Sequence, residues 1–172
     1  MRILLDTNVF LWIISEDARL SLAARDLFLD GKNVPLLSIA SVWEIMIKSS
    51  LRKLDLPENP GPFIREQLRL NSCTLLDITV EHCVMVASLP FHHKDPFDRL
   101  IIAQALVENI PVISADGIMK EYGVKNLFYR PRLPRQLQRP GGTATASSTS
   151  TSRTLPKPST PARCSISFRN RS

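Results

Sequence analysis

The 172-residue sequence has few of the features that several protein classes require. Its three cysteines, Cys73, Cys83 and Cys164, are odd in number and lack CxxC spacing, which argues against a disulfide framework or a structural zinc site. The three histidines form no HxxxH pair, so the pattern of a zinc hydrolase is missing. The longest strongly apolar run, residues 9–14, is too short to span a membrane. Because Asp6 also interrupts the first apolar stretch, we expect a soluble, cytoplasmic protein without a secretory signal.

Acidic residues are missing from the last part of the chain, and this divides the sequence in two. All 16 Asp and Glu residues lie within residues 1–128, which carry a net charge of −3. Residues 129–172 contain nine Lys and Arg and no acid, which gives them a net charge of +9. The overall charge of +6 is therefore an average of two unlike segments, and by itself it does not indicate a nucleic-acid partner.

The basic segment also has a composition that disfavours folding. Residues 141–160 contain eleven Ser or Thr and one large apolar side chain, and six of the 13 prolines follow residue 129. Such a segment buries too little apolar surface to offset its ordering entropy. We therefore predict a folded domain over residues 1–129 and a basic, disordered tail over residues 130–172. The composition leaves two interpretations of the tail open: an RNA-tethering arm, or a frameshifted or read-through terminus without a selected function.

Short apolar runs alternate with helical patterns over the first 128 residues. Strands are expected at residues 2–5, 34–39, 74–78 and 111–114, and a last edge strand at 126–129. Helices are expected around residues 9–14, 20–29, 41–51, 63–70, 80–89, 96–109 and 117–122. This alternation predicts a three-layer α/β domain with a mostly parallel sheet.

Four acids are expected at one edge of that sheet. Asp6 ends the first strand and Asp116 follows the fourth, and ligands bind outside the carboxyl ends of parallel strands. Glu44 and Asp98 are expected in the first turns of two helices that begin at the same edge. Carboxylates gathered without basic partners suit a hard cation such as Mg²⁺ or Mn²⁺.

Each acid, taken alone, also has a structural interpretation. Ser41 and Glu44 fit a capping box, Asp98 suits the positive end of a helix dipole, and Asp116 with Gly117 is a common turn pair. Asp6 is harder to explain in this way, because an acid that ends a buried strand needs a partner. The convergence of all four acids favours a site.

Four segments, in this order, resemble the motifs of PIN-domain ribonucleases, most closely the VapC toxins of type II VapBC toxin–antitoxin modules. They are LDTNV at residues 5–9, SVWEI at 41–45 with Lys48, HKDPFDRLIIAQA at 93–105, and ISAD at 113–116. The resemblance covers about residues 1–128. It implies a PIN fold with strand order 3-2-1-4-5, and a Mg²⁺- or Mn²⁺-dependent endoribonuclease that is silenced by a cognate antitoxin and is usually dimeric.

The resemblance also assigns roles to individual residues. The acidic quartet of the family falls on Asp6, Glu44, Asp98 and Asp116. We expect the metal to be held by Asp6, Asp98 and Asp116, directly or through water, with Glu44 completing the site. Asn8 and Ser114 match polar residues that orient waters or carboxylates, and Asp95 matches a helix cap. The common substrate of the family is tRNA, but nothing in these residues selects it.

The chemistry we expect is metal-assisted hydrolysis of RNA phosphodiester bonds. Glu44 or Asp116 is the candidate acceptor of the proton from the attacking water. Lys48 and Arg99 are candidates for RNA phosphate contact, although Lys48 also fits an ion pair with Glu44, and Arg99 is favoured to point elsewhere. The histidines at positions 92 and 93 are expected to cap or decorate a loop.

The residues leave two other functions open. The chain could be a catalytically silent PIN-like RNA-binding module, or another acidic α/β phosphohydrolase or receiver-like phosphoacceptor. The segment Asp6-Thr7-Asn8 lacks the DxD pair that would favour a phosphatase.

The apolar side chains of the first helix offer more surface than one buried face needs, which predicts a homodimer or antitoxin interface at Phe10, Trp12, Ile13 and Ile14.

Overall fold

The structure is a computed structural model that describes residues 1–57, 59–128 and 167–168. The predicted domain boundary after residue 129 lies outside these residues, as does the predicted tail except for residues 167–168. Within the described ranges, none of the helices combines the length and the apolar character that crossing a bilayer requires.

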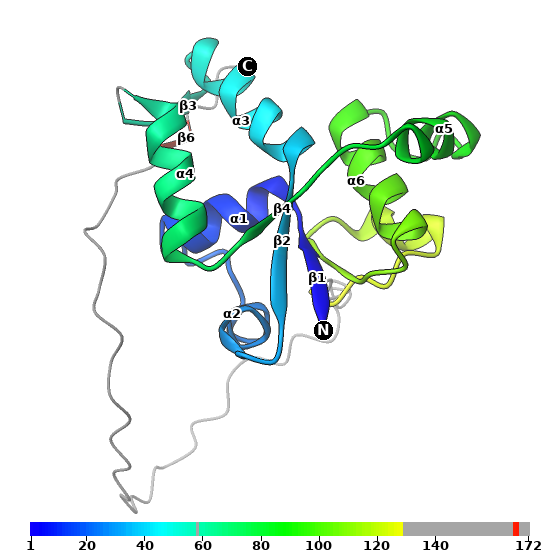
Figure 1. Cartoon of the computed structure of the whole chain (residues 1–172), viewed down its shortest axis with the longest axis horizontal. Coiled ribbons are helices and arrows are strands. Elements are labelled where there is room, and N and C mark those ends of the chain that lie inside the picture. Colours follow the sequence, from blue (N-terminus) through cyan, green and yellow to red (C-terminus); the bar gives the residue numbers. More distant parts are fainter. Residues whose placement is uncertain (58, 129–166, 169–172) are drawn as a thin grey trace, which may run out of the picture. The chain divides into compact units, whose positions relative to one another are not determined.

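Four strands form a parallel sheet in the order β4-β2-β1-β5 (Figure 1). They are β1 (Arg2–Leu5), β2 (Val34–Ser38), β4 (Thr74–Leu76) and β5 (Val112–Ile113). Leu5 of β1 lies opposite both Leu37 of β2 and Ile113 of β5, so the carboxyl ends of these three strands are level. Helices connect each strand to the next, as parallel pairing requires.

The observed strand order matches the predicted order 3-2-1-4-5 for its first four strands. The edge strand expected at residues 126–129 is reduced to an isolated parallel bridge between Val112 and Asn126. The physical reason is local, because the Asn126 side-chain oxygen accepts the Phe128 backbone N–H at 3.0 Å. An Asx turn of this kind bends the chain away from an extended strand.

Helices cover both faces of the sheet, which confirms the predicted three-layer α/β class (Figure 1). One apolar cluster joins the sheet to helices of the first half of the chain: α1 (Thr7–Ile14), α2 (Leu22–Leu29), α3 (Ile39–Ser50) and α4 (Pro60–Leu70). The other cluster joins the opposite face to α5 (Val80–Ser88), α6 (Pro96–Val107) and the 3₁₀ helix η1 (Gly117–Tyr122).

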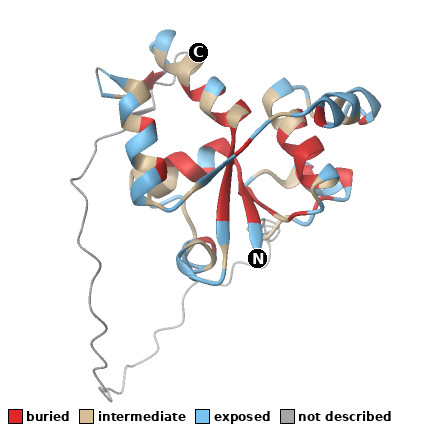
Figure 2. Cartoon of the chain, viewed as in Figure 1, coloured by how far each residue is buried: buried red, intermediate tan, exposed pale blue. Residues whose placement is uncertain are grey.

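Successive strand residues point into opposite clusters, which explains why the strands are continuous apolar runs. In β1, Leu4 belongs to the cluster of α5 and α6, whereas Ile3 and Leu5 belong to the other. The neighbouring strands follow the same alternation, and the strands in the middle of the molecule are buried (Figure 2). A sheet covered on both faces leaves its carboxyl edge as the place for polar side chains.

The start of α3 differs from the prediction and changes the position of Glu44. The helix begins at Ile39, and Ser38 is its N-cap, with its hydroxyl accepting the Ala40 backbone N–H at 3.0 Å. Glu44 therefore lies in the second turn rather than the first, and the alternative interpretation of Ser41 and Glu44 as a capping box does not hold. Ser38, which ends the buried strand β2, is the cap instead.

One further pairing was not predicted. The strand β3 (Leu54–Asp55) pairs in antiparallel orientation with β6 (Ser167–Phe168), within the part of the chain that was expected to be the tail. Strands of two residues are too short to show a sequence period.

The cap assignment in α3 predicts different costs for two serine substitutions. Ser38→Ala is expected to lower the free energy of unfolding by about 1 kcal/mol, because the Ala40 N–H loses its acceptor. Ser41→Ala is the matched control, since the buried Ser41 hydroxyl has no hydrogen-bond partner among the described residues. Urea denaturation followed by circular dichroism measures both changes, and an equal or larger loss for Ser41→Ala would contradict the assignment.

Candidate metal centre

Asp6 is buried at the point where β1 ends and α1 begins. The residue is only 4% exposed. Both of its carboxylate oxygens accept hydrogen bonds. Oδ1 accepts the Asn8 backbone N–H at 3.2 Å, which caps α1, and Oδ2 accepts the Ser114 hydroxyl at 2.5 Å. Ser114 directly follows β5, so the expected convergence of these two strand ends is present in the structure.

Asp116 is held beside Asp6 by a short chain of hydrogen bonds. The Ser114 hydroxyl oxygen accepts the Asp116 backbone N–H at 3.0 Å. Asn126 donates its side-chain N–H to the Asp116 carbonyl at 2.9 Å, and Asp116 Oδ1 accepts the Ile118 N–H at 2.9 Å to cap η1. Asn126 was not singled out in the sequence, because a lone Asn in a loop carries no recognisable pattern.

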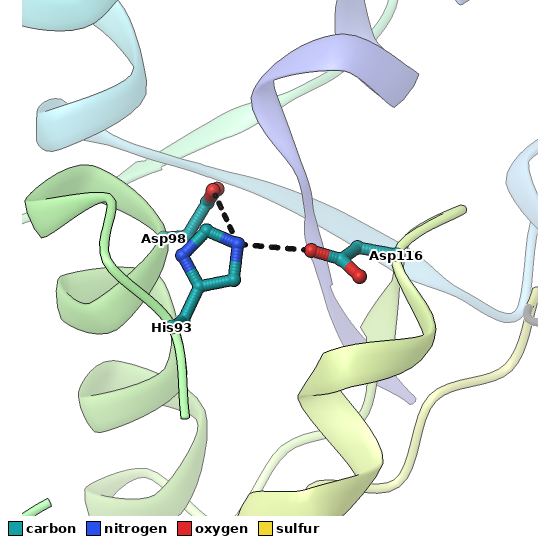
Figure 3. Close-up of side chains that lie close together, drawn as sticks. All are labelled: His93, Asp98 and Asp116. Carbon is teal, nitrogen blue, oxygen red and sulfur yellow. Dashed lines mark hydrogen bonds and ion pairs between the residues drawn. The ribbon is translucent and has the colours of Figure 1, made fainter. Parts of the chain in front are cut away.

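Asp98 lies in the first turn of α6, where Asp95 is the N-cap. The Asp98 carboxylate faces Asp116 across the ring of His93 (Figure 3). His93 Nε2 is 3.3 Å from Asp98 Oδ2 and 3.0 Å from Asp116 Oδ2. One ligand atom from each of these three side chains lies within 4.8 Å of the others, a spacing that could hold one metal ion.

Glu44 is buried in the second turn of α3 and is 6% exposed. One of its carboxylate oxygens forms an ion pair with Lys48, one turn further along the helix. The other oxygen, Oε2, is buried and has no hydrogen-bond partner among the described residues. A buried carboxylate oxygen without a donor is costly, so this atom calls for a partner that the described residues do not supply.

Burial, together with neighbouring negative charge, raises the pKa values of Asp98 and Asp6. Burial, followed by the negative charges of Asp6 and Asp95, raises the pKa of Asp98 to about 7, and Glu44 adds to the effect while His93 opposes it. Burial is also the main cause that raises the pKa of Asp6, with smaller contributions from Glu44 and Asp116. The hydrogen bonds from Ser114 and Asn8 lower the pKa of Asp6 but do not cancel the effect of burial.

We call Asp6, Glu44, Asp98 and Asp116 the acidic cluster. Its donors are carboxylate oxygens, with one imidazole nitrogen at its border, and this oxygen-rich set suits a hard cation such as Mg²⁺ or Mn²⁺. The unpartnered Glu44 oxygen and the raised pKa of Asp98 both indicate negative charge that the side chains alone do not balance. The residues present therefore fit a divalent cation.

The other predicted site residues, Asn8, Lys48 and Arg99, differ in how they lie relative to the acidic cluster. Asn8 is exposed, and the contact it makes with Asp6 is through its backbone N–H. Lys48 is in the predicted ion pair with Glu44. Arg99 is 5% exposed and turns away from the cluster, because its guanidinium donates to three backbone carbonyls. These belong to residues 86, 89 and 90, at 2.7–3.0 Å, and favour a structural role over phosphate contact.

His93 lies in the loop between α5 and α6, as expected, but the contact of its ring with two members of the acidic cluster was not predicted. The usable signal was its spacing, two residues before the N-cap Asp95 and five before Asp98, which directs the ring towards the start of α6.

The parallel three-layer architecture places the chain in the open α/β class, whose ligand sites lie outside the carboxyl ends of the strands, and the acidic cluster lies at that edge. Residues 3–125 match the PIN domain family, and the chain therefore belongs to this family. Comparison with curated proteins gives no match.

Several solved structures share the fold. The chain is similar to a structure of VapBC2 from Rickettsia felis bound to a DNA fragment from the promoter, with a TM-score of 0.54 and 16% identity over 76% of this chain and 98% of that one. It is similar to VapBC-1 from nontypeable Haemophilus influenzae, with a TM-score of 0.53 and 18% identity over 74% and 98%. FitAcB from Neisseria gonorrhoeae gives a TM-score of 0.52 and 21% identity over 73% and 96%.

The raised pKa of Asp98 predicts a pH-dependent stability in the metal-free protein. The folded protein binds the Asp98 proton more tightly than the unfolded chain does, so stability is lost as pH rises from about 4 to about 7. In EDTA at pH 8, Asp98→Asn should therefore raise the free energy of unfolding by more than about 1 kcal/mol. Thermal melts measured from pH 4 to 8 test this.

The matched control is Asp26→Asn, which removes an exposed carboxylate from α2. Its melting temperature is expected to follow that of the wild type at every pH. An Asp98→Asn protein that is no more stable than the wild type at pH 8 would show that the ionised Asp98 carboxylate does not destabilise the folded protein.

Proposed function

We propose that the protein is a metal-dependent endoribonuclease and the toxin of a VapBC-type toxin–antitoxin module. The observation that carries the proposal is the acidic cluster, whose four acids come from separate segments of the chain, with Asp6 and Glu44 buried and Asp98 and Asp116 partly buried. Membership of the PIN domain family and the shared fold with two VapBC structures support it.

Three of the acids are proposed to hold the cation. Asp98 and Asp116 face each other at a spacing suited to one ion, and Asp6 is joined to Asp116 through the Ser114 hydroxyl. A bound Mg²⁺ or Mn²⁺ would supply an activated water and neutralise negative charge on the phosphate. These residues would bind and orient the ion, and hydrogen bonds to the carboxylates of Asp6 and Asp116 fix the direction of those two side chains.

Glu44 and Lys48 have complementary proposed roles. Glu44 Oε2 is buried and unpartnered, which makes it the candidate acceptor of the proton from the attacking water. Lys48 is tied to the other Glu44 oxygen and its side chain is 35% exposed, so its ammonium group can meet a phosphate at the border of the cluster. Arg99 has no such role in this proposal.

The proposed partners are an RNA substrate, with tRNA as one candidate, a VapB-like antitoxin and a second copy of the chain, all in the cytoplasm. The antitoxin is supported by the VapBC structures that share the fold. The apolar segment on which the interface prediction rested is less available than expected, because Phe10 is fully buried and Trp12, Ile13 and Ile14 pack against the core. A monomeric mass by light scattering would contradict the dimer.

The RNase proposal predicts metal-dependent cleavage of structured RNA. The purified protein should cleave a tRNA mixture with Mg²⁺ or Mn²⁺ and should be inactive in EDTA, since the acids need a cation to act on a phosphate. Asp6→Asn and Asp98→Asn are expected to remove the activity while keeping side-chain size, and Asn also remains a good helix cap at position 6. Gel electrophoresis of end-labelled RNA measures cleavage.

Asp26→Asn serves again as the control and should cleave like the wild type. RNA binding without cleavage would favour the silent RNA-binding module instead. Activity that survives EDTA or both substitutions in the cluster would contradict the mechanism.

The toxin proposal predicts growth arrest on induced expression in a bacterial host. The wild-type protein should stop growth through RNA cleavage, and the Asp98→Asn protein, produced at the same level, should not. Optical density and viable counts after induction measure the effect. Equal arrest by the two proteins would attribute toxicity to something other than the acidic cluster.

A further inference from the structure

We propose that His93 is a positioning residue for the cation site, because its Nε2–H donates a hydrogen bond to Asp116 while the same nitrogen lies in close contact with Asp98. This inference rests on the metal site of the proposed function and adds to it a residue outside the acidic quartet. It is carried by the hydrogen bonds around the imidazole ring, which determine what each ring nitrogen can do (Figure 3).

The first step concerns Nδ1 of His93. The Asp95 backbone N–H donates to Nδ1 at 3.1 Å. A backbone N–H can only donate, so Nδ1 must offer its lone pair and carries no proton. In the neutral imidazole the single ring proton is then on Nε2. Asp95 is the N-cap of α6, so the ring is attached to the start of the helix that carries Asp98.

The second step concerns Nε2. This atom hydrogen-bonds to Asp116 Oδ2 at 3.0 Å and lies 3.3 Å from Asp98 Oδ2. A nitrogen that carries a proton has no lone pair for a metal ion, which argues against direct ligation through Nε2. The donor instead fixes the orientation of Asp116 and places its positive N–H edge beside Asp98, and outer-shell groups tune metal sites in this way.

The third step concerns how the ring is fixed in place. The His93 backbone N–H donates to the Tyr122 hydroxyl oxygen at 2.6 Å. Tyr122 is 8% exposed and belongs to the apolar cluster that contains α6. It also ends η1, the helix that Asp116 caps. His93 is therefore anchored to the two elements that carry its two carboxylate partners, and it joins them across the acidic cluster.

The alternative roles are a direct metal ligand and a group that merely fills the space between the acids. A direct ligand would need the proton on Nδ1, which the Asp95 N–H opposes. A space-filling group would compete with the cation, so removing it would strengthen metal binding. The three roles differ in the effect of substitution and in the coupling of the ring nitrogen to the metal.

The test compares His93→Gln with His93→Leu in Mn²⁺ binding to the metal-free full chain, measured by calorimetry. The glutamine amide N–H can replace the Nε2 donor, so its affinity is expected within about 3-fold of the wild type, whereas leucine should weaken binding by about 10–100-fold. His92→Gln is the matched control and should bind like the wild type, because His92 contacts the Tyr122 ring rather than the acids.

Two spectroscopic measurements complete the test. Long-range ¹H–¹⁵N correlation on the metal-free protein, at a pH where the ring is neutral, should show His93 protonated at Nε2. Pulsed electron paramagnetic resonance of the Mn²⁺ complex should show no ¹⁴N directly bound to the ion. Circular dichroism of each variant establishes that it is folded.

The possible outcomes distinguish a failure of the proposed His93 role from a failure of the proposed metal site. Mn²⁺ binding that is equally weak in both His93 variants, with ¹⁴N bound to the ion, would overturn the positioning role in favour of a ligand. Unchanged or tighter binding in His93→Leu would overturn it in favour of space filling. A wild-type protein that binds no Mn²⁺ would overturn the proposed metal site itself. A proton on Nε2 of His93 would then indicate only a structural hydrogen bond to Asp116.

Discussion

The structure depends on the burial of one carboxylate, that of Asp6, at the end of the central strand. Removing this group from water is costly, and the donors that compensate come from outside its strand: the Ser114 hydroxyl after β5 and the Asn8 N–H in α1. Both donors are in place only when β5 lies level with β1 and α1 starts at residue 7. One polar group therefore specifies strand register and helix position together, and the rest of the acidic cluster is built on this frame.

The cluster gathers more negative charge than its surroundings balance. Lys48 and His93 contact it, yet the pKa of Asp98 remains at about 7 and that of Asp6 is also raised. This unbalanced charge is consistent with the proposed cation site, because a site that neutralised its own acids would have little attraction for a cation. The backbone around the acids is correspondingly well bonded, as the contacts of Asn126 and Ser114 show.

Sequence periodicity was sufficient for the layers and for the edge at which the acids meet, because both follow from the alternation of short apolar runs with helical patterns. The strand order came from the resemblance to PIN-domain ribonucleases. What it could not provide depends on single side chains in three dimensions. Ser38 rather than Ser41 caps α3, Asn126 ends the last pairing after one bridge, and the ring of His93 turns inward because Asp95 N–H and Tyr122 hold it. Arg99 follows an acid of the cluster in sequence but points away from it, towards the carbonyls at the end of α5.

The central position of β1 has a consequence for the order in which the molecule is made. Its partner on one side, β5, lies more than a hundred residues later in the chain, and Ser114 and Asp116 follow still further on. During synthesis β1, which Asp6 directly follows, emerges before the other three strands of the parallel sheet, and β5, which completes the surroundings of Asp6, emerges after them. Contacts so distant in sequence form late in folding. In the nascent chain Asp6 therefore lacks the neighbouring residues of the acidic cluster until nearly the whole domain has been synthesised. Any activity of the cluster can begin only after that point.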